Sequence, residues 1–537
     1  MNARTGAAGL IVVFGILYAW RLHEPELSKI DECRSGVIVR DILEEGDWLL
    51  PRTPDGYLCE KPPAYYHQAA VASAVFGANE WTLRGVSVLM ALATLAVTWF
   101  WASLYGSPRV AALAVIALGS NVVMTMWART AMVDMTFTFF VTAGLASYFA
   151  GRLGRLTPPR AAILCGVSLG LAVLSKGPLG LLLPMAAIMG EVLWISRGRF
   201  WNLPIPWGPT ALGAGLILGI SLLWYLPGCL VGGMEFVNTC ILDENFYMPL
   251  GLKHGIAGSH VKSPLFYPSR VLVGLIPIAA FLPETIRWLF RRDAGVARAH
   301  AAAWFGFAFL VLSISSAKRL HYLLPLQPAA SLMIAVAVGR VLDEGPTPAL
   351  RWGVRVCGAV VLLAGVGVIV LSFAGPGVLA KGRFMDDPDF FAGWEVPLAL
   401  LGAMMVGLGT AQLVSSWRGA MAMVRGIALM GILSVALRSV LYDGMRTTQD
   451  TVRPFIALSR RLIPPGARVA VVGTPAGYGL QFYWPERLSG DVSTADFYFD
   501  SLPPPDQLPK GAEVLASQSF YHGRSTVALI RNPPRPK

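Results

Sequence analysis

The sequence predicts a mainly α-helical, polytopic membrane protein that ends in a small C-terminal α/β domain. Of its 537 residues, 55% are hydrophobic and 14% are charged, and the mean hydropathy is +0.56. Soluble globular domains carry about 25% charged residues, so this composition excludes that class. Apolar runs of roughly 18 to 23 residues, the length that crosses a bilayer as a helix, recur along most of the chain.

About thirteen of these runs are candidate spans. The first is short and follows Arg4, as in a secretory signal, but no small-residue cleavage site comes after it. We therefore expect an uncleaved anchor. The runs cover residues 6–20, 83–104, 107–125, 131–151, 160–175, 178–195, 207–228, 267–290, 300–316, 321–342, 352–374, 395–415 and 421–441.

Basic short loops predict the orientation, because loops rich in Lys and Arg stay cytoplasmic. Their arginines follow even-numbered spans, which places the N-terminus inside and the C-terminal domain outside. The net charge of +12 reflects this topology and attraction to anionic membrane lipids, and it gives no reason to expect nucleic acid. These loop residues are Arg152, Arg155, Arg160, Arg197, Arg199, Arg287, Arg291, Arg292, Arg298, Arg351, Arg355, Arg418 and Arg425.

Two domains are predicted, a transmembrane domain over 1–445 and an external α/β domain over 446–537. Within 22–82, residues 34–45 have the amphipathic pattern of a helix that lies in the membrane interface. A second interfacial helix is expected after Pro62 and Pro63, because proline is tolerated in a first helical turn. In the second domain, four runs have strand composition between Gly and Pro turns, namely "ARVAVVG", "LQFYWP", "EVLASQS" and "STVALIR".

Acidic and basic side chains gather where the predicted spans meet the external face. Asp31, Arg34 and Lys61 belong to the first external loop, and Asp134 and Lys176 stand at the edges of later spans. A charge at membrane depth is costly, so it persists only when it is paired, solvated or functional. We therefore predict that these residues form one site on one membrane face. The alternative for Asp31 is an exposed loop residue or a helix cap.

The basic residues of this set predict an anion. Arg34, Lys61, Lys176 and Lys318 stand at external span edges without matching acids, and they would repel one another if they met. A phosphate or pyrophosphate group would fit between them, because Arg and Lys bind its oxygens strongly. Snorkelling to the membrane surface is the alternative for Lys318 and Arg319.

The cysteines leave a disulfide open. Six cysteines are too few for a disulfide scaffold, but Cys33 and Cys59 share the first external loop. In an oxidising compartment a bridge between them would place Arg34 beside Glu60, and it would contribute roughly 3 kcal/mol on the chain-entropy model. The alternative is two unrelated buried thiols.

An ordered set of motifs resembles a known family, the bacterial GT-C glycosyltransferases that use lipid-linked sugars. These enzymes are related to protein O-mannosyltransferases and to the aminoarabinose transferase of lipid A. Each motif alone is weak, whereas the ordered set is specific, and the resemblance covers residues 1 to about 340. The motifs are "DECRSGVIVRDILEEGDWLLPR", "EKPP", "ARTAMVDM", "LSKGP", "LLWY", "HVKSPLFYPSRVLVGLIPIAAFLPE" and "SSAKRLHYLLPLQPA".

The resemblance implies an enzyme that moves a sugar from a polyprenyl phosphate carrier to an external acceptor, with inversion. Asp31 matches the catalytic acid of the first external loop, which would act as general base. Asp134 matches the second acid, next to Arg129, and would position the substrate. Lys61 and Lys176 match the ligands of the donor phosphate.

Other residues have supporting roles under the same resemblance. Arg34, Lys318 and Tyr322 match further contacts to the donor phosphate. Glu60 and His260 match polar positions that hold a divalent metal in some members. No other cofactor is implied.

The resemblance implies aminoarabinose or a related pentose or hexose as the sugar and lipid A as the acceptor, in the bacterial inner membrane. Cys33 and Ser35 replace the alanine and tyrosine that commonly follow the acidic pair, which leaves both identities open. A protein, another glycolipid or a polysaccharide is an alternative acceptor. A retaining reaction would need a second nucleophilic carboxylate, for which Glu32 is the candidate. A transporter is the alternative from another class, although charges at one surface without repeated halves do not fit it.

Overall fold

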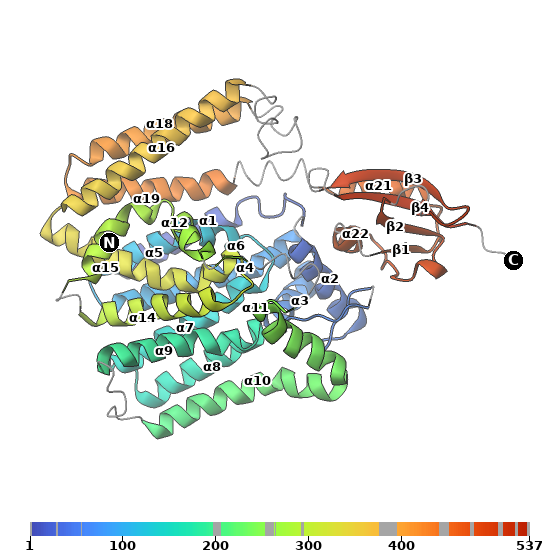
Figure 1. Cartoon of the computed structure of the whole chain (residues 1–537), viewed down its shortest axis with the longest axis horizontal. Coiled ribbons are helices and arrows are strands. Elements are labelled where there is room, and N and C mark those ends of the chain that lie inside the picture. Colours follow the sequence, from blue (N-terminus) through green and yellow to red (C-terminus); the bar gives the residue numbers. More distant parts are fainter. Residues whose placement is uncertain are drawn as a thin grey trace.

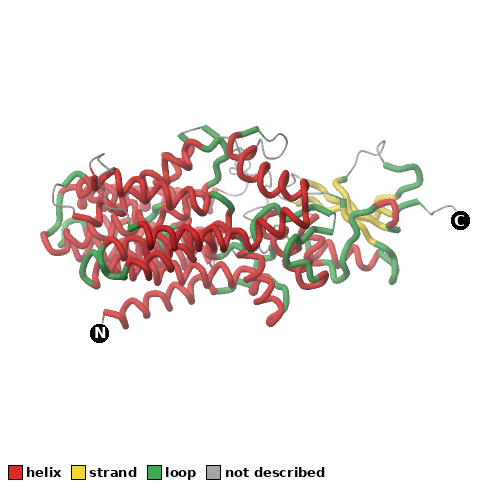
Figure 2. Tube along the Cα trace, turned by 90° about the horizontal axis from the view of Figure 1, so that it is seen from below, coloured by secondary structure: helices red, strands yellow, loops and turns green. Residues whose placement is uncertain are grey.

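The structure is a computed structural model that describes residues 3–27, 30–54, 56–196, 206–252, 262–263, 265–291, 295–374, 395–439, 451–472, 477–502, 508–520 and 525–533. Long helices lie roughly side by side in a bundle, and a small sheet lies beyond one end of it (Figure 1). In the view turned by 90°, the sheet again lies at the end opposite to the start of the first helix (Figure 2). The predicted fold class is confirmed.

Within the described residues, ten helices are long and apolar enough to cross a membrane, or eleven if one bent pair counts as a span. The helices of the bundle are α1 (Ala3–Ala19), α2 (Ile30–Glu45), α3 (Ala64–Phe76), α4 (Glu80–Ser103), α5 (Pro108–Gly119), α6 (Val122–Ala128), α7 (Val133–Arg152), α8 (Pro158–Lys176), α9 (Leu179–Ser196), α10 (Trp207–Phe236), η2 (Val237–Tyr247), α11 (Met248–Leu250), α12 (Phe266–Gly274), η4 (Ile278–Phe281), α13 (Leu282–Leu289), α14 (Gly295–Ile314), η5 (Leu320–Leu326), α15 (Gln327–Glu344), α16 (Pro348–Ala374), α18 (Glu395–Ser415) and α19 (Ala420–Leu437).

Two of the predicted spans are not straight helices. The run at 267–290 is divided among α12, η4 and α13, because Pro277 and Pro283 lack the N–H that a continuous helix needs. The run at 107–125 divides into α5 and α6, which meet at a bend of 65°. Asn121 starts α6 by accepting a hydrogen bond from the backbone N–H of Met124. These breaks account for most of the difference from the predicted number of spans.

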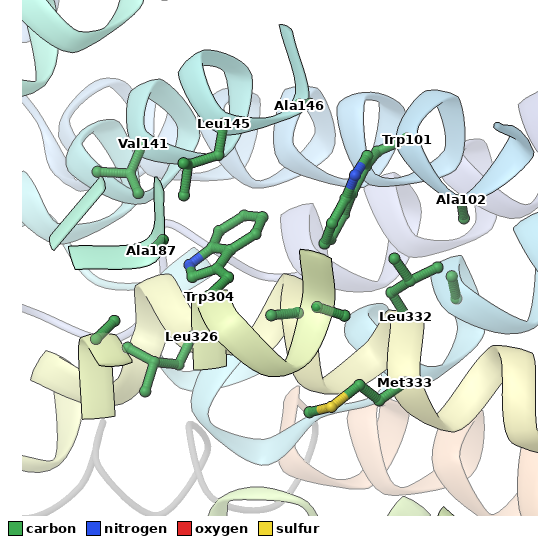
Figure 3. Close-up of a cluster of buried hydrophobic side chains, with 14 of the residues drawn as sticks. Trp101, Ala102, Val141, Leu145, Ala146, Ala187, Trp304, Leu326, Leu332 and Met333 are labelled. Carbon is green, nitrogen blue, oxygen red and sulfur yellow. The ribbon is translucent and has the colours of Figure 1, made fainter. Parts of the chain in front are cut away.

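Aromatic rings and small residues pack the bundle. The centroid of the Trp101 ring lies 4.9 Å from that of Trp304, and Trp101 stacks on Phe149 at 5.6 Å between centroids; Figure 3 shows the two indoles as neighbours within this cluster. Helices α16 and α18 approach closely, since a Cβ at Gly365 would lie 2.7 Å from the carbonyl oxygen of Gly402. Such close contacts between small residues are typical of helix packing in membranes.

Helices α2 and α3 lie at the end of the bundle that faces the sheet (Figure 1). Both predicted helices of the first loop are thus confirmed, and α3 follows Pro63 as expected. Ile38, Val39 and Ile42 of α2 are buried, so the apolar side of this helix packs on protein.

The C-terminal domain contains a four-stranded sheet in the order β1-β2-β4-β3, in which only β1 and β2 are parallel. Its elements are α21 (Arg453–Leu462), β1 (Val469–Val471), α22 (Gly477–Tyr483), η7 (Val492–Thr494), β2 (Phe497–Ser501), β3 (Glu513–Phe520) and β4 (Ser525–Arg531). Phe455, Leu480, Phe499 and Leu529 form its core. The predicted domain boundary at 445 falls outside the described residues.

Three of the four predicted strands are confirmed, and one is wrong. The run "LQFYWP" overlaps α22, and β2 was not predicted. The aromatic residues of this run do not alternate across a sheet: Phe482 lies against Gly36 of α2, the Tyr483 hydroxyl donates to Glu80 of α4 at 2.8 Å, and Trp484 packs against Phe499. Contacts with the transmembrane domain therefore favour the helix α22 over the strand that the composition of this run predicts.

Candidate active site

A charged cavity lies where the starts of α2 and α7, the end of α8 and the segment η5 come together. Its volume is about 60 Å³, whereas pockets that bury a drug-sized ligand measure about 300 to 1,000 Å³. The cavity is lined by Asp31, Arg34, Ser35, Glu60, Lys61, Tyr66, Met132, Val133, Asp134, Lys176, Met248, Arg319, His321 and Tyr322. Seven of the nine predicted site residues therefore meet at one place.

Asp31 reaches the cavity from the first turn of α2, where a carboxylate is favoured by the partial positive charge of the helix start. Its Oδ1 accepts from Nη2 of Arg34 at 3.2 Å, and its Oδ2 accepts from Nη1 of Arg319 at 2.9 Å. Arg34 also donates to Oε1 of Glu60 at 3.4 Å. Asp31 is thus held between two guanidinium groups.

Lys61 enters from the loop before α3 and forms an ion pair with Glu244 of η2. The side chains of both residues are largely buried, with exposed fractions of 16% and 15%. Segment η2 is a π-helix, a geometry that often marks functional sites. Beside this pair, Tyr57 donates a hydrogen bond to Oε2 of Glu60.

Asp134 and Lys176 face each other across two helix ends that suit their charges. Asp134 lies in the first turn of α7 and Lys176 in the last turn of α8, and their Oδ1 and Nζ atoms are 2.5 Å apart. The ring of Tyr322 lies 4.4 Å from the same ammonium group. Nε2 of His321 lies 3.8 Å from Oδ1 of Asp134.

Gly177 ends α8 and lets η2 approach this corner of the cavity. Its φ of +67° is a conformation that L side chains rarely adopt. A Cβ at this position would also lie 2.5 Å from Oδ1 of Asn245 in η2. Glycine is therefore required both by the turn and by the contact.

The sequence argument about unmatched cations is wrong. Arg34 and Arg319 are paired with Asp31, Lys61 with Glu244, and Lys176 with Asp134. Asp31 lies only three positions before Arg34, but the acids that pair with Lys61, Lys176 and Arg319 come from segments distant in sequence, so most of the balance is visible only in the fold. The cations do not require an anion for stability, and a phosphate would have to compete with carboxylates already in place.

Burial and neighbouring charges shift the pKa values of Asp31 and Lys61 in opposite directions. Burial would raise the pKa of Asp31, but Arg319 and Arg34 outweigh it and hold that pKa below its usual value. Burial would lower the pKa of Lys61, but Glu244 and Glu60 outweigh it and raise that pKa. Both groups are therefore charged at neutral pH.

Several residues singled out in the sequence do not line the cavity. Lys318 turns its ammonium toward the carbonyl oxygens of Ser315 and Lys262, so its predicted place among the cavity cations is not borne out by the geometry. Arg129 donates to the carbonyls of Leu17, Tyr18 and Trp20 at the end of α1 and supports the fold there. His260 lies outside the described residues.

Glu32 is fully buried and points away from the cavity. Both of its carboxylate oxygens accept from Arg84, at 3.0 and 3.2 Å, and Oε1 also accepts from the backbone N–H of Ala131 at 2.9 Å. Glu32 therefore ties α2 to α4 and to the start of α7. The idea that it could serve as a nucleophile in a retaining reaction is wrong for this geometry.

The described residues contain neither the Cys33–Cys59 disulfide nor a cluster that could bind the expected metal. Cys33 and Cys59 are both buried and are not bridged to each other, and burial raises the pKa of the Cys59 thiol to about 11. Among the residues that the structure describes, no group of three His, Cys, Asp or Glu side chains could hold a metal. Both oxygens of Glu60 already accept hydrogen bonds from Arg34 and Tyr57, so a metal at Glu60 would compete with these donors.

Sequence reasoning missed Arg319 and Glu244 as members of the site. Arg319 was considered only as a snorkelling residue, although it follows Lys318 in a quoted motif. Glu244 belongs to the polar segment after α10 and carries no local signal of its own. Only the fold brings Glu244 to Lys61, 183 positions away.

Comparison with known proteins supports the predicted resemblance. Residues 44–239 match the family model of dolichyl-phosphate-mannose-protein mannosyltransferase. The chain is 27% identical over 443 residues to an undecaprenyl phosphate-alpha-4-amino-4-deoxy-L-arabinose arabinosyl transferase of Edwardsiella ictaluri, covering 80% of this chain and 76% of the relative.

Two solved structures share the fold. They are the ArnT of Cupriavidus metallidurans in the apo state, with a TM-score of 0.75 and 21% identity, and the same protein bound to undecaprenyl phosphate, with a TM-score of 0.73 and 22% identity. The matches cover 98% of this chain in each case, and 98% and 97% of the ArnT chain. The alignment therefore includes the C-terminal domain as well as the bundle.

The matching family model, the arabinosyl transferase relatives and the shared fold together indicate a multi-pass membrane glycosyltransferase that resembles the GT-C class. The arabinosyl transferase relatives and the two ArnT structures narrow this class of protein further. The chain is ArnT-like, as the ordered motifs predicted.

Proposed function

We propose that this chain transfers a sugar from a polyprenyl phosphate carrier to lipid A, with inversion at the anomeric carbon. The sugar is aminoarabinose or a related pentose or hexose. The observation that carries the proposal is the meeting of Asp31, Lys61, Asp134 and Lys176, from four separate segments, around one cavity. The arabinosyl transferases to which the chain is similar support the same type of donor.

Asp31 is the general base in this proposal. Its carboxylate takes the proton from an acceptor hydroxyl or from a singly ionised acceptor phosphate, while the acceptor oxygen attacks the anomeric carbon. The bond between that carbon and the carrier phosphate breaks, and its electron pair leaves with the phosphate. The depressed pKa of Asp31 keeps this carboxylate ionised before the substrates enter.

Lys61 and Lys176 hold the carrier phosphate, and Arg34 supports them. Charge grows on the leaving phosphate in the transition state, and fixed cations in a site shielded from water stabilise it strongly. This stabilisation replaces a general acid. Tyr322 and Asp134 hold the ammonium group of Lys176 in place, and Asp134 also orients the sugar.

Donor binding requires the cavity to open by an exchange of ion pairs. A volume of about 60 Å³ leaves no room for a sugar phosphate, and Glu244 holds the Lys61 ammonium group. The entering phosphate takes the place of Glu244 on Lys61, so that one anion replaces another. The segment η2, which carries Glu244, moves aside in this step.

The proposed location is the bacterial inner membrane, with the N-terminus in the cytoplasm and the C-terminal domain in the periplasm. The start of α1 and the C-terminal sheet lie at opposite ends of the bundle (Figures 1 and 2), which agrees with this orientation. The cavity lies at the end that carries the sheet, so the proposal places it at the outer leaflet.

Mass spectrometry of lipid A tests the function. Cells that lack the gene, cells with the parental gene and cells with an Asp31→Asn variant are compared. We expect a sugar adduct on lipid A only with the parental gene. An unchanged lipid A profile together with an altered glycan or glycoprotein would refute lipid A as the acceptor. No change in any envelope glycoconjugate, with the protein present in the membrane, would refute the transferase itself.

A further inference from the structure

The C-terminal domain is hydrogen-bonded to α2, the helix that carries Asp31. Nη1 of Arg40, in α2, lies 3.0, 3.0 and 2.9 Å from the backbone carbonyl oxygens of Gln481, Phe482 and Trp484. These carbonyls belong to the end of α22 and the residue beyond it, where a helix has no internal donors for them. A side chain of the transmembrane domain thus completes the end of a helix in the C-terminal domain.

Asp41, the next residue of α2, links three parts of the molecule. Its Oδ1 accepts from Nη2 of Arg487 at 2.7 Å, and its Oδ2 accepts from the backbone N–H of Arg52 at 2.8 Å. The Asp41 side chain is only 5% exposed, so solvent screens this pairing little. The C-terminal domain is therefore connected through α2 to the loop that leads to Lys61.

The segment just before α2 is held by the same domain. The Tyr483 hydroxyl accepts from the backbone N–H of Leu27 at 2.7 Å, and the backbone N–H of Val452 donates to Oε2 of Glu26 at 2.8 Å. Between these two anchor regions α22 lies directly on α2, since a Cβ at Gly36 would meet the Phe482 ring at 2.6 Å.

Asp31 lies between these attachments, in the first turn of the continuous helix α2. Arg40 lies nine positions after Asp31, which corresponds to about 14 Å along the helix axis. A shift or tilt of α2 at Arg40 therefore displaces the Asp31 carboxylate. A misplacement of about 1 Å in a reacting group can lower the rate by about 100-fold.

We infer that the C-terminal domain is a positioning component of the active site, which fixes α2 through Arg40, Asp41 and Tyr483 and thereby places the Asp31 carboxylate. This inference rests on the proposed function of Asp31. Arg40, Asp41 and Tyr483 are positioning residues, because none of them lines the cavity. Lys61 and Lys176, which hold the donor phosphate in the proposal, stand outside α2, and only the supporting cation Arg34 is carried by that helix.

The test separates donor binding from turnover in purified full-length protein. Arg40→Gln, Arg40→Lys and Tyr483→Phe are compared with the parental protein and with Arg531→Gln. Arg531 is a matched control because it pairs with Glu513 on the exposed side of the sheet, away from α2. The measurements are kcat and KM for sugar transfer from a polyprenyl phosphate sugar, Kd for undecaprenyl phosphate, and the Tm of each variant.

For Arg40→Gln we expect kcat to fall by tenfold or more, with Kd for undecaprenyl phosphate within about twofold of the parental value. Arg40→Lys should recover part of the rate, because an ammonium group still donates to carbonyls. Tyr483→Phe, which removes only a hydroxyl and tests the same attachment if the Arg40 variants are unstable, should lower kcat about threefold. Arg531→Gln should match the parental protein.

Parental kcat in both Arg40→Gln and Tyr483→Phe would overturn the inference, and so would an equal loss in Arg531→Gln. A loss confined to Kd or KM, or one fully explained by a smaller folded fraction, would also overturn it. A parental protein that transfers no sugar would instead refute the proposed function.

Discussion

Arg319 Nη1 lies 2.9 Å from Oδ2 of Asp31, although 288 positions separate the two residues along the chain. Arg34 approaches the other carboxylate oxygen at 3.2 Å. The proposed base is therefore ionised and restrained at the same time, and its ionisation depends in part on a residue that is distant in sequence.

Replacing Arg319 with Gln should move the acidic limb of the pH–rate profile to higher pH. The pKa of Asp31 is held below its usual value by Arg319 and Arg34 against the effect of burial, so the loss of one cation raises it. Transfer needs the ionised carboxylate, and it is lost as the pH falls through this pKa. Rates measured from pH 4 to pH 8 should fall earlier in the variant than in the parental protein or in Arg531→Gln. Coincident acidic limbs would contradict this role of Arg319.

Glu244→Gln should strengthen the binding of undecaprenyl phosphate. The substitution removes the carboxylate that holds Lys61, so the phosphate no longer displaces an anion. We expect Kd to fall by about tenfold, which corresponds to about 1.4 kcal/mol. The matched control is Glu235→Gln, since Glu235 precedes the same π-helix but pairs with Arg52 on the surface. Weaker binding in Glu244→Gln would show that Glu244 assists the donor instead of competing with it.

Glu32→Gln should lower the stability of the protein as well as its rate of sugar transfer. Glu32 and Arg84 are buried, with exposed side-chain fractions of 0% and 2%, and loss of one partner from a buried ion pair costs about 3–5 kcal/mol. The Tm of the purified variant should fall clearly, whereas Glu44→Gln, which changes an exposed partner of Arg40, should leave it nearly unchanged. A parental Tm in Glu32→Gln would show that the pair does not hold α2 against α4.

The sequence predicts the charged residues of the site better than their partners. Asp134 and Lys176 stand at the edges of apolar runs and Asp31 in the loop between two of them, where the cost of burying a charge makes these residues conspicuous. The pairing of Lys61 with Glu244, or of Asp31 with Arg319, depends on the packing of helices that are distant in sequence. For the same reason the sequence suggests unmatched cations, whereas the fold balances them.

The sequence predicts a helix correctly where the length of an apolar run is enough to define it. The break within 267–290 has a local cause in Pro277 and Pro283, and the prolines could have indicated it. The helix α22 could not be foreseen in this way, because Phe482 and Tyr483 have strand-like composition but adopt a helix while they contact α2 and α4 of the other domain.

The most direct test of the account combines two measurements on purified Asp31→Asn protein. One is the rate of sugar transfer from a polyprenyl phosphate sugar, and the other is the Kd for undecaprenyl phosphate. The account predicts that transfer falls by at least 100-fold, because the base is lost, while Kd stays within a few-fold of the parental value, because Lys61 and Lys176 remain. Parental transfer by folded Asp31→Asn protein would contradict it.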